Sequence, residues 1–146
     1  MSLEIRPLVA SDRAEWGALW QGYLAYYETM LPKAMYDTCF ARMLSGEAGE
    51  FQGRMALWDG RPVGLVHFLF HRHGWKVENT CYLQDLFTLP DMRGKGVARA
   101  MIERVYAEAD AAGAPSVYWL TQDFNTTARR LYDKLATKTP FIKYAR

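Results

Sequence analysis

Residues 90–98 are the part of this sequence best suited to binding an anion, and they read Pro-Asp-Met-Arg-Gly-Lys-Gly-Val-Ala. Gly94 and Gly96 have no side chains, so a phosphate can approach the backbone amides there closely. Arg93 and Lys95 place positive charge beside those amides. A helical pattern follows directly, and the first turn of a helix carries unpaired N–H groups and partial positive charge. The segment therefore predicts a pyrophosphate-binding site, with an ordinary strand-to-helix turn as the alternative.

The same residues exclude two common nucleotide-binding motifs. The P-loop requires GxxxxGK followed by Ser or Thr, and the sequence has no such run. The dinucleotide fingerprint GxGxxG requires a third glycine, and Arg99 occupies that position. We therefore expect neither a P-loop nor a Rossmann-type site.

The periodicity of apolar residues predicts the elements that position this segment. Alternating or clustered apolar residues predict strands at residues 3–8, 51–58, 62–70, 80–89, 117–120 and 141–144. Apolar residues at helical spacing predict helices at residues 12–29, 36–44 and 94–112, and a last helix that opens at Asn125.

The order of these elements predicts the fold class. Asp59-Gly60 is a hairpin signal, so the strands in the middle of the chain should be antiparallel. The strand–helix–strand passage over residues 80–120 should be parallel and right-handed. We therefore expect an α+β fold in three layers, with a mixed, mostly antiparallel sheet and helices on both faces. A length of 146 residues fits one domain, residues 1–146.

Composition narrows the class of protein. The net charge is only +2 and the basic residues are scattered, which does not favour nucleic-acid binding. Cys39 and Cys81 form no CxxC pair, as is typical of free thiols in a reducing compartment. No run approaches 18 apolar residues, and residues 1–7 lack the apolar core of a signal peptide. We expect a soluble, cytoplasmic protein without nucleic-acid or membrane partners.

Three further patterns give a resemblance to the GNAT superfamily of N-acetyltransferases. Arg93-x-x-Gly96-x-Ala98 fits the acetyl-CoA signature of that superfamily, with a strand before it and a long helix after it. Residues 82–88, Tyr-Leu-Gln-Asp-Leu-Phe-Thr, resemble the fourth strand of the spermidine/spermine-type acetyltransferases. Asn125 and Tyr132 match an Asn and a Tyr of the same type, seven residues apart, and the tail after Tyr132 resembles a subgroup with an extended ending.

The resemblance implies an enzyme that moves acetyl from acetyl-CoA to a primary amine by direct attack, without a metal. Tyr132 would be the general acid for the leaving thiolate, since a phenol with a pKa of ~10 is neutral at pH 7. An ordinary core tyrosine is the alternative for that residue. A backbone N–H of the strand would stabilise the oxyanion. The implied acetyl-CoA-binding residues are Leu86, Phe87, Thr88, Arg93, Gly94, Lys95, Gly96, Val97, Ala98, Arg99 and Asn125.

The general base is the point where this sequence departs from the family. Gln84 stands where the family often has a Glu that acts through water, and an amide cannot accept that proton. We expect Gln84 to position a water molecule or the amine. The possible substitutes are His67, Glu28 and Asp85, although strict alternation would point Asp85 to the opposite sheet face. The remaining alternative is that the enzyme selects the neutral amine and needs no base.

The acceptor is predicted to be a small amine or a polyamine, with an amino acid or a protein lysine as the second choice. Tyr27, Glu28 and Asp85 are the expected binding residues, because aromatic rings and carboxylates suit an ammonium group. A CoA-binding module without turnover is the rival class, and the family resemblance favours a homodimer. His67, His71 and His73 alternate but have no Cys or carboxylate at tight spacing, so no metal site is predicted.

Overall fold

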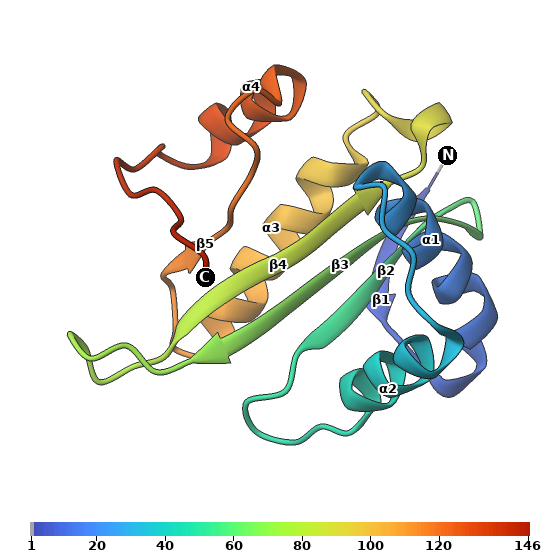
Figure 1. Cartoon of the computed structure of the whole chain (residues 1–146), viewed down its shortest axis with the longest axis horizontal. Helices are drawn as coiled ribbons and strands as arrows, with labels where there is room; N and C mark the ends of the chain where they lie inside the picture. Colours follow the sequence, from blue (N-terminus) through green and yellow to red (C-terminus); the bar gives the residue numbers. More distant parts are fainter. Residues whose placement is uncertain (1) are drawn as a thin grey trace.

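A mixed sheet runs through the centre of the protein in the computed structural model, which describes residues 2–146 and leaves Met1 outside (Figure 1). Its order follows the chain: β1 (Leu3–Pro7), β2 (Gln52–Trp58), β3 (Arg61–His71), β4 (Thr80–Thr88) and β5 (Val117–Tyr118). The pairs from β1 to β4 are antiparallel, and β4 and β5 are parallel. The predicted mixed, mostly antiparallel sheet of an α+β fold is therefore confirmed.

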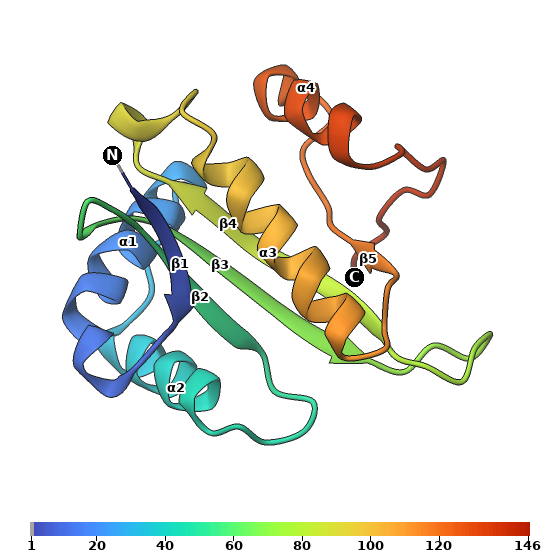
Figure 2. The same ribbon diagram turned by 180° about the vertical axis from the view of Figure 1, so that it is seen from behind.

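Helices cover both faces of the sheet. Helices α1 (Arg13–Tyr26) and α2 (Lys33–Leu44) pack on one face, and α3 (Val97–Ala111) crosses the other, as Figure 2 shows from behind. Helix α4 (Thr126–Leu135) follows β5, and the 3-10 turns η1 (Ala10–Asp12) and η2 (Pro90–Met92) precede α1 and α3. No helix within residues 2–146 combines the length and the apolar composition needed to cross a bilayer.

The core has two apolar layers, because successive strand residues point to opposite faces. Leu65 packs under α1 and α2, whereas Val66 packs under α3. Trp16 and Trp20 of α1 are buried in the first layer, so the aromatic face of this helix belongs to the core.

The alternation breaks at one place, where β3 and β4 pair irregularly. His67 pairs with Asp85 and Phe68 pairs with Leu83, so Gln84 has no partner. This bulge re-aims the side chains that follow, and the Asp85 carboxylate contacts His67 on the α1 side of the sheet. The expectation that Asp85 points to the opposite sheet face was wrong, because it assumed an unbroken strand.

The C-terminal part also differs from the prediction. Strand β5 is two residues long, and Tyr118 and Leu120 are exposed rather than buried. Residues 137–146 contain no helix or strand, so the strand predicted at 141–144 is not formed. The apolar alternation there indicated a strand, but no neighbouring strand within the described chain pairs with it. Because β5 pairs with β4 only at Cys81 and Tyr82, the two strands diverge beyond that point.

Candidate active site

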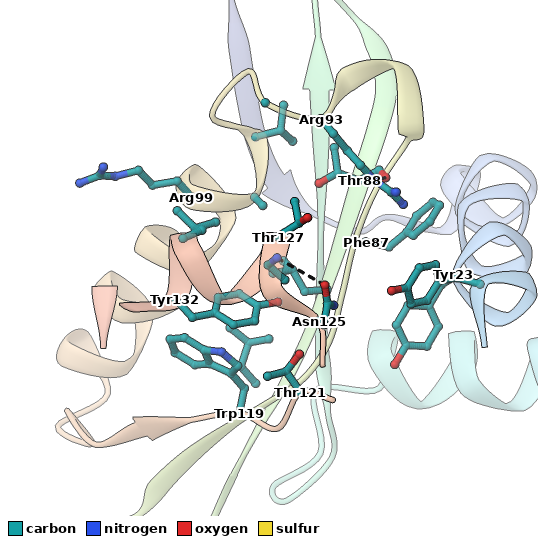
Figure 3. Close-up of a pocket in the computed structure, with 18 of the residues that line it drawn as sticks. Tyr23, Phe87, Thr88, Arg93, Arg99, Trp119, Thr121, Asn125, Thr127 and Tyr132 are labelled. Atoms are coloured by element: carbon teal, nitrogen blue, oxygen red, sulfur yellow. Dashed lines mark hydrogen bonds between the residues drawn. The ribbon is translucent and has the colours of Figure 1, made fainter. Parts of the chain in front are cut away.

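The divergence of β4 and β5 opens a cavity of about 680 Å³ between β4, α4 and the C-terminal end of α1 (Figure 3). Most of the predicted site residues line it: Tyr27, Gln84, Leu86, Phe87, Thr88, Arg93, Gly94, Gly96, Val97, Ala98, Arg99, Asn125 and Tyr132. Lys95, Glu28 and Asp85 do not line it. The structure therefore brings together residues that are up to 105 positions apart, from Tyr27 to Tyr132.

The glycine turn at the start of α3 has the conformation that an anion site needs. Gly94 and Gly96 have φ of +76° and +85°, a region that residues with a side chain rarely adopt. Gly96 is the N-cap of α3, so no side chain caps the first amides of that helix. A Cβ at either glycine would meet nothing within 4 Å, so the approach to these amides is open. The N-terminal amides of α3 can therefore bind an anion directly.

The cations of the turn differ in position. Arg93 lines the cavity, and its Nε donates to the Thr88 carbonyl oxygen at 3.2 Å. Arg99 also lines the cavity, and its Nε donates to Glu103 at 2.8 Å. Lys95 is exposed and is not part of the lining, so its side chain can contribute charge but does not form a wall of the cavity.

Helix α4 presents the predicted Asn and Tyr to the cavity. The Asn125 side chain caps the helix, and its Oδ1 accepts a hydrogen bond from the Ala128 amide at 3.4 Å. The Tyr132 ring packs edge-on against Trp119, with 5.4 Å between centroids. Burial raises the pKa of the Tyr132 hydroxyl, and the neighbouring tyrosines Tyr27 and Tyr26 raise it further. Tyr132 is therefore a neutral phenol that can donate a proton or a hydrogen bond.

The end of α1 contributes a wall of tyrosines to the other side of the cavity. Tyr23, Tyr26 and Tyr27 line it, with ring centroids 5.1 Å apart for Tyr23 and Tyr27 and 5.0 Å for Tyr26 and Tyr27. Glu28 follows the helix with a positive φ of 54° and is exposed outside the lining. The expectation that Glu28 lies beside the acceptor is therefore not supported by its position.

Sequence reasoning missed some lining residues. Tyr23 was not among the expected site residues, although its spacing of four from Tyr27 places both on one helix face. Trp119, Thr121 and Thr127 also line the cavity, and no local pattern marks them.

A buried polar contact lies behind the tyrosine wall. The His67 ring is 1% exposed, with Trp16 Nε1 at 3.0 Å from its Nε2 and Asp85 Oδ2 at 3.0 Å from its Nδ1. His71 bonds instead to the Tyr118 hydroxyl. Within residues 2–146, no group of three or more His, Cys, Asp or Glu side chains is placed to hold a metal.

The two cysteines are buried and free. Burial raises the pKa of Cys39 to about 11 and that of Cys81 to about 12. Neither thiol is therefore ionised at neutral pH, which argues against a covalent acyl-cysteine intermediate.

Comparison with known proteins agrees with this geometry. Residues 16–136 match the acetyltransferase (GNAT) family. The chain belongs to that family. It is 35% identical over 144 residues to the D-amino-acid N-acetyltransferase HPA3 of Saccharomyces cerevisiae, covering 97% of this chain and 89% of that protein. It is 30% identical over 103 residues to the thialysine N-epsilon-acetyltransferase of Bos taurus, covering 70% of this chain and 56% of that protein.

A solved structure of similar fold is the aminoglycoside N-acetyltransferase AAC(6')-Iy in complex with CoA. It superimposes with a TM-score of 0.84 at 19% identity, over 99% of this chain and 94% of that chain. The predicted GNAT fold is confirmed. The chain is a GNAT N-acetyltransferase, and its co-substrate is acetyl-CoA.

Proposed function

We propose that this GNAT enzyme transfers acetyl from acetyl-CoA directly to a small primary amine, within one domain of residues 1–146. The observation that carries the proposal is the single cavity that joins the glycine turn of α3 to the tyrosine wall of α1, past Tyr132. Its volume of about 680 Å³ is in the range of small-molecule sites.

The cofactor would lie along one side of this cavity. The amides of residues 94–99 would bind the pyrophosphate, since they stand at a helix N-terminus flanked by Arg93 and Arg99. The backbone of residues 86–88 would bind the pantetheine arm and the thioester, beyond the point where β5 leaves β4. Asn125 would bind the arm from the opposite side, from its place in the lining.

The reaction follows from the placement of these groups. The amine nitrogen attacks the thioester carbon, the C–N bond forms, and the carbonyl oxygen gains negative charge that a backbone N–H of β4 would stabilise. The C–S bond then breaks, Tyr132 would give its proton to the departing thiolate, and Tyr132 would regain a proton from water before the next turnover. Gln84, in the bulge, would position the amine or a water molecule.

A free amino acid is the acceptor class that we expect first. The support is the yeast D-amino-acid N-acetyltransferase, which this chain matches over nearly the whole length of both proteins. A polyamine or another amine without a carboxylate is the second candidate. The tyrosine wall favours it, because rings and the nearby Asp85 suit an ammonium, while the lining cations Arg93, Arg99 and Lys134 lie on other elements.

The test is a thiol-release assay with acetyl-CoA and a panel of amines: D- and L-amino acids in pairs, spermidine, a short diamine and a lysine peptide. Amino acids should be the best acceptors, and the D/L ratio shows the stereochemical preference. A clear preference for spermidine or the diamine would replace the first candidate by the second. Tight binding of acetyl-CoA by calorimetry, with no thiol release for any amine, would overturn the proposed turnover.

A further inference from the structure

The buried contact behind the tyrosine wall joins three polar side chains by hydrogen bonds. The indole N–H of Trp16 donates to His67 Nε2 at 3.0 Å, and His67 Nδ1 lies 3.0 Å from Asp85 Oδ2. Trp16 is fully buried, His67 is 1% exposed and the Asp85 side chain is 12% exposed. The three groups come from α1, β3 and β4, so the fold rather than one local motif assembles them.

The donor and acceptor capacities of these side chains show which atom of each hydrogen bond carries the hydrogen. An indole nitrogen can only donate, so His67 Nε2 must be the acceptor and carries no hydrogen. The imidazole hydrogen is then on Nδ1, which donates to the Asp85 carboxylate. The Trp16 N–H occupies the side of the ring where a second imidazole hydrogen would have to stand.

The negative charge of Asp85 acts on several neighbouring tyrosine hydroxyls. Burial raises the pKa of the Tyr23 hydroxyl above its ordinary value, and the charge of Asp85 and a hydrogen bond with it raise that pKa further. Burial raises the pKa values of Tyr27, which follows α1, of Tyr82 on β4 and of Cys39 on α2, and the charge of Asp85 raises each of them further.

No arginine or lysine within residues 2–146 forms a salt bridge with Asp85, whose Oδ2 accepts the hydrogen bond from His67 Nδ1. The charge of this carboxylate is thus not neutralised by a fixed cation. Tyr23 lines the cavity and Asp85 does not. The Trp20 ring packs against Tyr23 at 4.8 Å and against His67 at 5.0 Å between centroids, so Tyr23 lies next to the His67–Asp85 pair on its cavity side.

We propose that Trp16, His67, Asp85 and Tyr23 form the proton-accepting chain for the acceptor amine, in place of the carboxylate that Gln84 lacks. The proposal rests on the amine-acetylation function given above. Tyr23 touches the amine, Asp85 receives the proton, and His67 and Trp16 are positioning residues.

The proton moves as the C–N bond forms. The attacking nitrogen then carries positive charge and is far more acidic than a free ammonium. Its N–H proton passes to the Tyr23 oxygen while the Tyr23 O–H proton passes to an Asp85 oxygen. Asp85 ends protonated, Tyr23 ends unchanged, and the proton later returns through Tyr23 to water, so no further reactant is needed.

The test compares Asp85→Asn and Tyr23→Phe with the wild-type enzyme in steady-state thiol release, using the best amine of the panel from pH 6 to 10. Both variants should lose about 100-fold or more in kcat, as general-base catalysis predicts, with acetyl-CoA affinity within a few-fold of wild type. Their rates should rise more steeply with pH than the wild-type rate, because hydroxide then replaces the missing acceptor.

Two control variants match these substitutions. His71→Gln alters a histidine that lies on β3 with His67 but bonds to Tyr118, and Tyr36→Phe removes a hydroxyl on α2 outside the cavity lining. Both controls should keep wild-type kcat and pH profile. Thermal melts and acetyl-CoA calorimetry report whether each variant is folded.

Trp16→Phe tests the positioning role. Without the indole N–H, nothing holds His67 Nε2, and the orientation of the imidazole against Asp85 is no longer fixed. In the folded variant kcat should therefore fall while the KM for acetyl-CoA stays near the wild-type value, a split that a loss of stability alone would not produce.

The possible outcomes distinguish a failure of the proposed proton transfer from a failure of the proposed amine acetylation. If the wild-type enzyme turns over and folded Asp85→Asn and Tyr23→Phe keep its kcat and pH profile, the proton chain is wrong and the acetylation function stands. If the wild-type enzyme acetylates no amine of the panel, the function itself fails.

Discussion

Tyr132 lines the cavity with its ring held against Trp119, and burial raises the pKa of its hydroxyl. We expect Tyr132→Phe to lower kcat by about 100-fold or more, because the leaving thiolate loses its proton donor. Acetyl-CoA affinity should change little, since the ring remains. Steady-state thiol release and calorimetry measure the two effects, and Tyr144→Phe on the exposed tail is the control. An unchanged kcat would assign Tyr132 to packing.

The raised pKa of the Tyr132 hydroxyl also predicts how the rate depends on pH. Because this hydroxyl ionises only above the usual pKa of a tyrosine, it stays protonated over the pH range in which amines become neutral. The wild-type rate should therefore rise toward pH 9–10 without a fall from loss of this donor, because the reference pKa of ~10 is a lower limit for it. A fall beginning near pH 8 would show that another acid limits the reaction.

Gln84 gives a prediction of its own at the residue scale. If Asp85 and Tyr23 accept the proton, Gln84→Glu should leave the position of the pH–rate profile unchanged. A large shift of that profile from alkaline toward neutral pH would show instead that the enzyme lacks a base, and that a carboxylate at position 84 supplies one.

The role of a residue could be predicted from the sequence where that role depends only on residues next to it in the chain. The anion site at Arg93, Gly94 and Gly96 needs only a turn and the helix after it, and both are local. The contact of Trp16, His67 and Asp85 was not open to prediction, because each residue comes from a different element. Asp85 was even assigned to the wrong face, since the direction of its side chain depends on how β3 pairs with β4.

At the scale of elements, the start of α3 depends on the backbone of Gly96. Its φ of +85° should make Gly96→Ala cost about 1–2 kcal/mol of unfolding free energy, and the new methyl would stand beside the pyrophosphate amides. We therefore expect Gly96→Ala to lower the melting temperature and also to weaken acetyl-CoA binding, as measured by calorimetry.

Gly49 supplies a matched control for that substitution. It has the same φ of +85° and open space around a Cβ, but it lies in the loop before β2. Gly49→Ala should therefore lose stability in a thermal melt and keep wild-type affinity for acetyl-CoA. Equal affinities for the two variants would contradict a cofactor site at this turn.

The periodicity of apolar residues was enough to predict every helix and the strands from β1 to β4, because each has one face in a core layer. It was not enough at the ends of the sheet. The length of β5 and the absence of a strand at residues 141–144 depend on a pairing partner, which a single strand pattern does not reveal. The bulge at Gln84 has the same cause.

At the scale of the molecule, exposed apolar side chains gather on the β3–β4 loop and on the C-terminal tail, among other places. Trp75 and Val77 on the β3–β4 loop are each 90% exposed, and Phe141, Ile142 and Tyr144 on the tail are 77–88% exposed. Such side chains are typical of association surfaces when they gather in patches. We expect a homodimer, to be measured by size-exclusion chromatography with light scattering.

Substitution of the tail tests where the two chains would meet. The double substitution Phe141→Ser and Ile142→Ser should lower the measured mass of the protein in solution toward that of one chain. The reason is that the two substitutions remove apolar surface that a second copy would bury. Glu47→Gln, on an exposed loop elsewhere, should leave the mass unchanged. A wild-type protein that stays at the mass of one chain at high concentration would contradict the expectation.

The bulge in β4 has a consequence for how this enzyme can evolve. Gln84 has no partner across the strand pair and is exposed, yet it lines the cavity beside the tyrosine wall. Most positions next to a reacting centre are constrained twice, by the chemistry and by the packing that holds the fold. Position 84 is released from the second constraint, so a lineage can exchange residues there and sample new acceptors while the stability of the domain hardly changes.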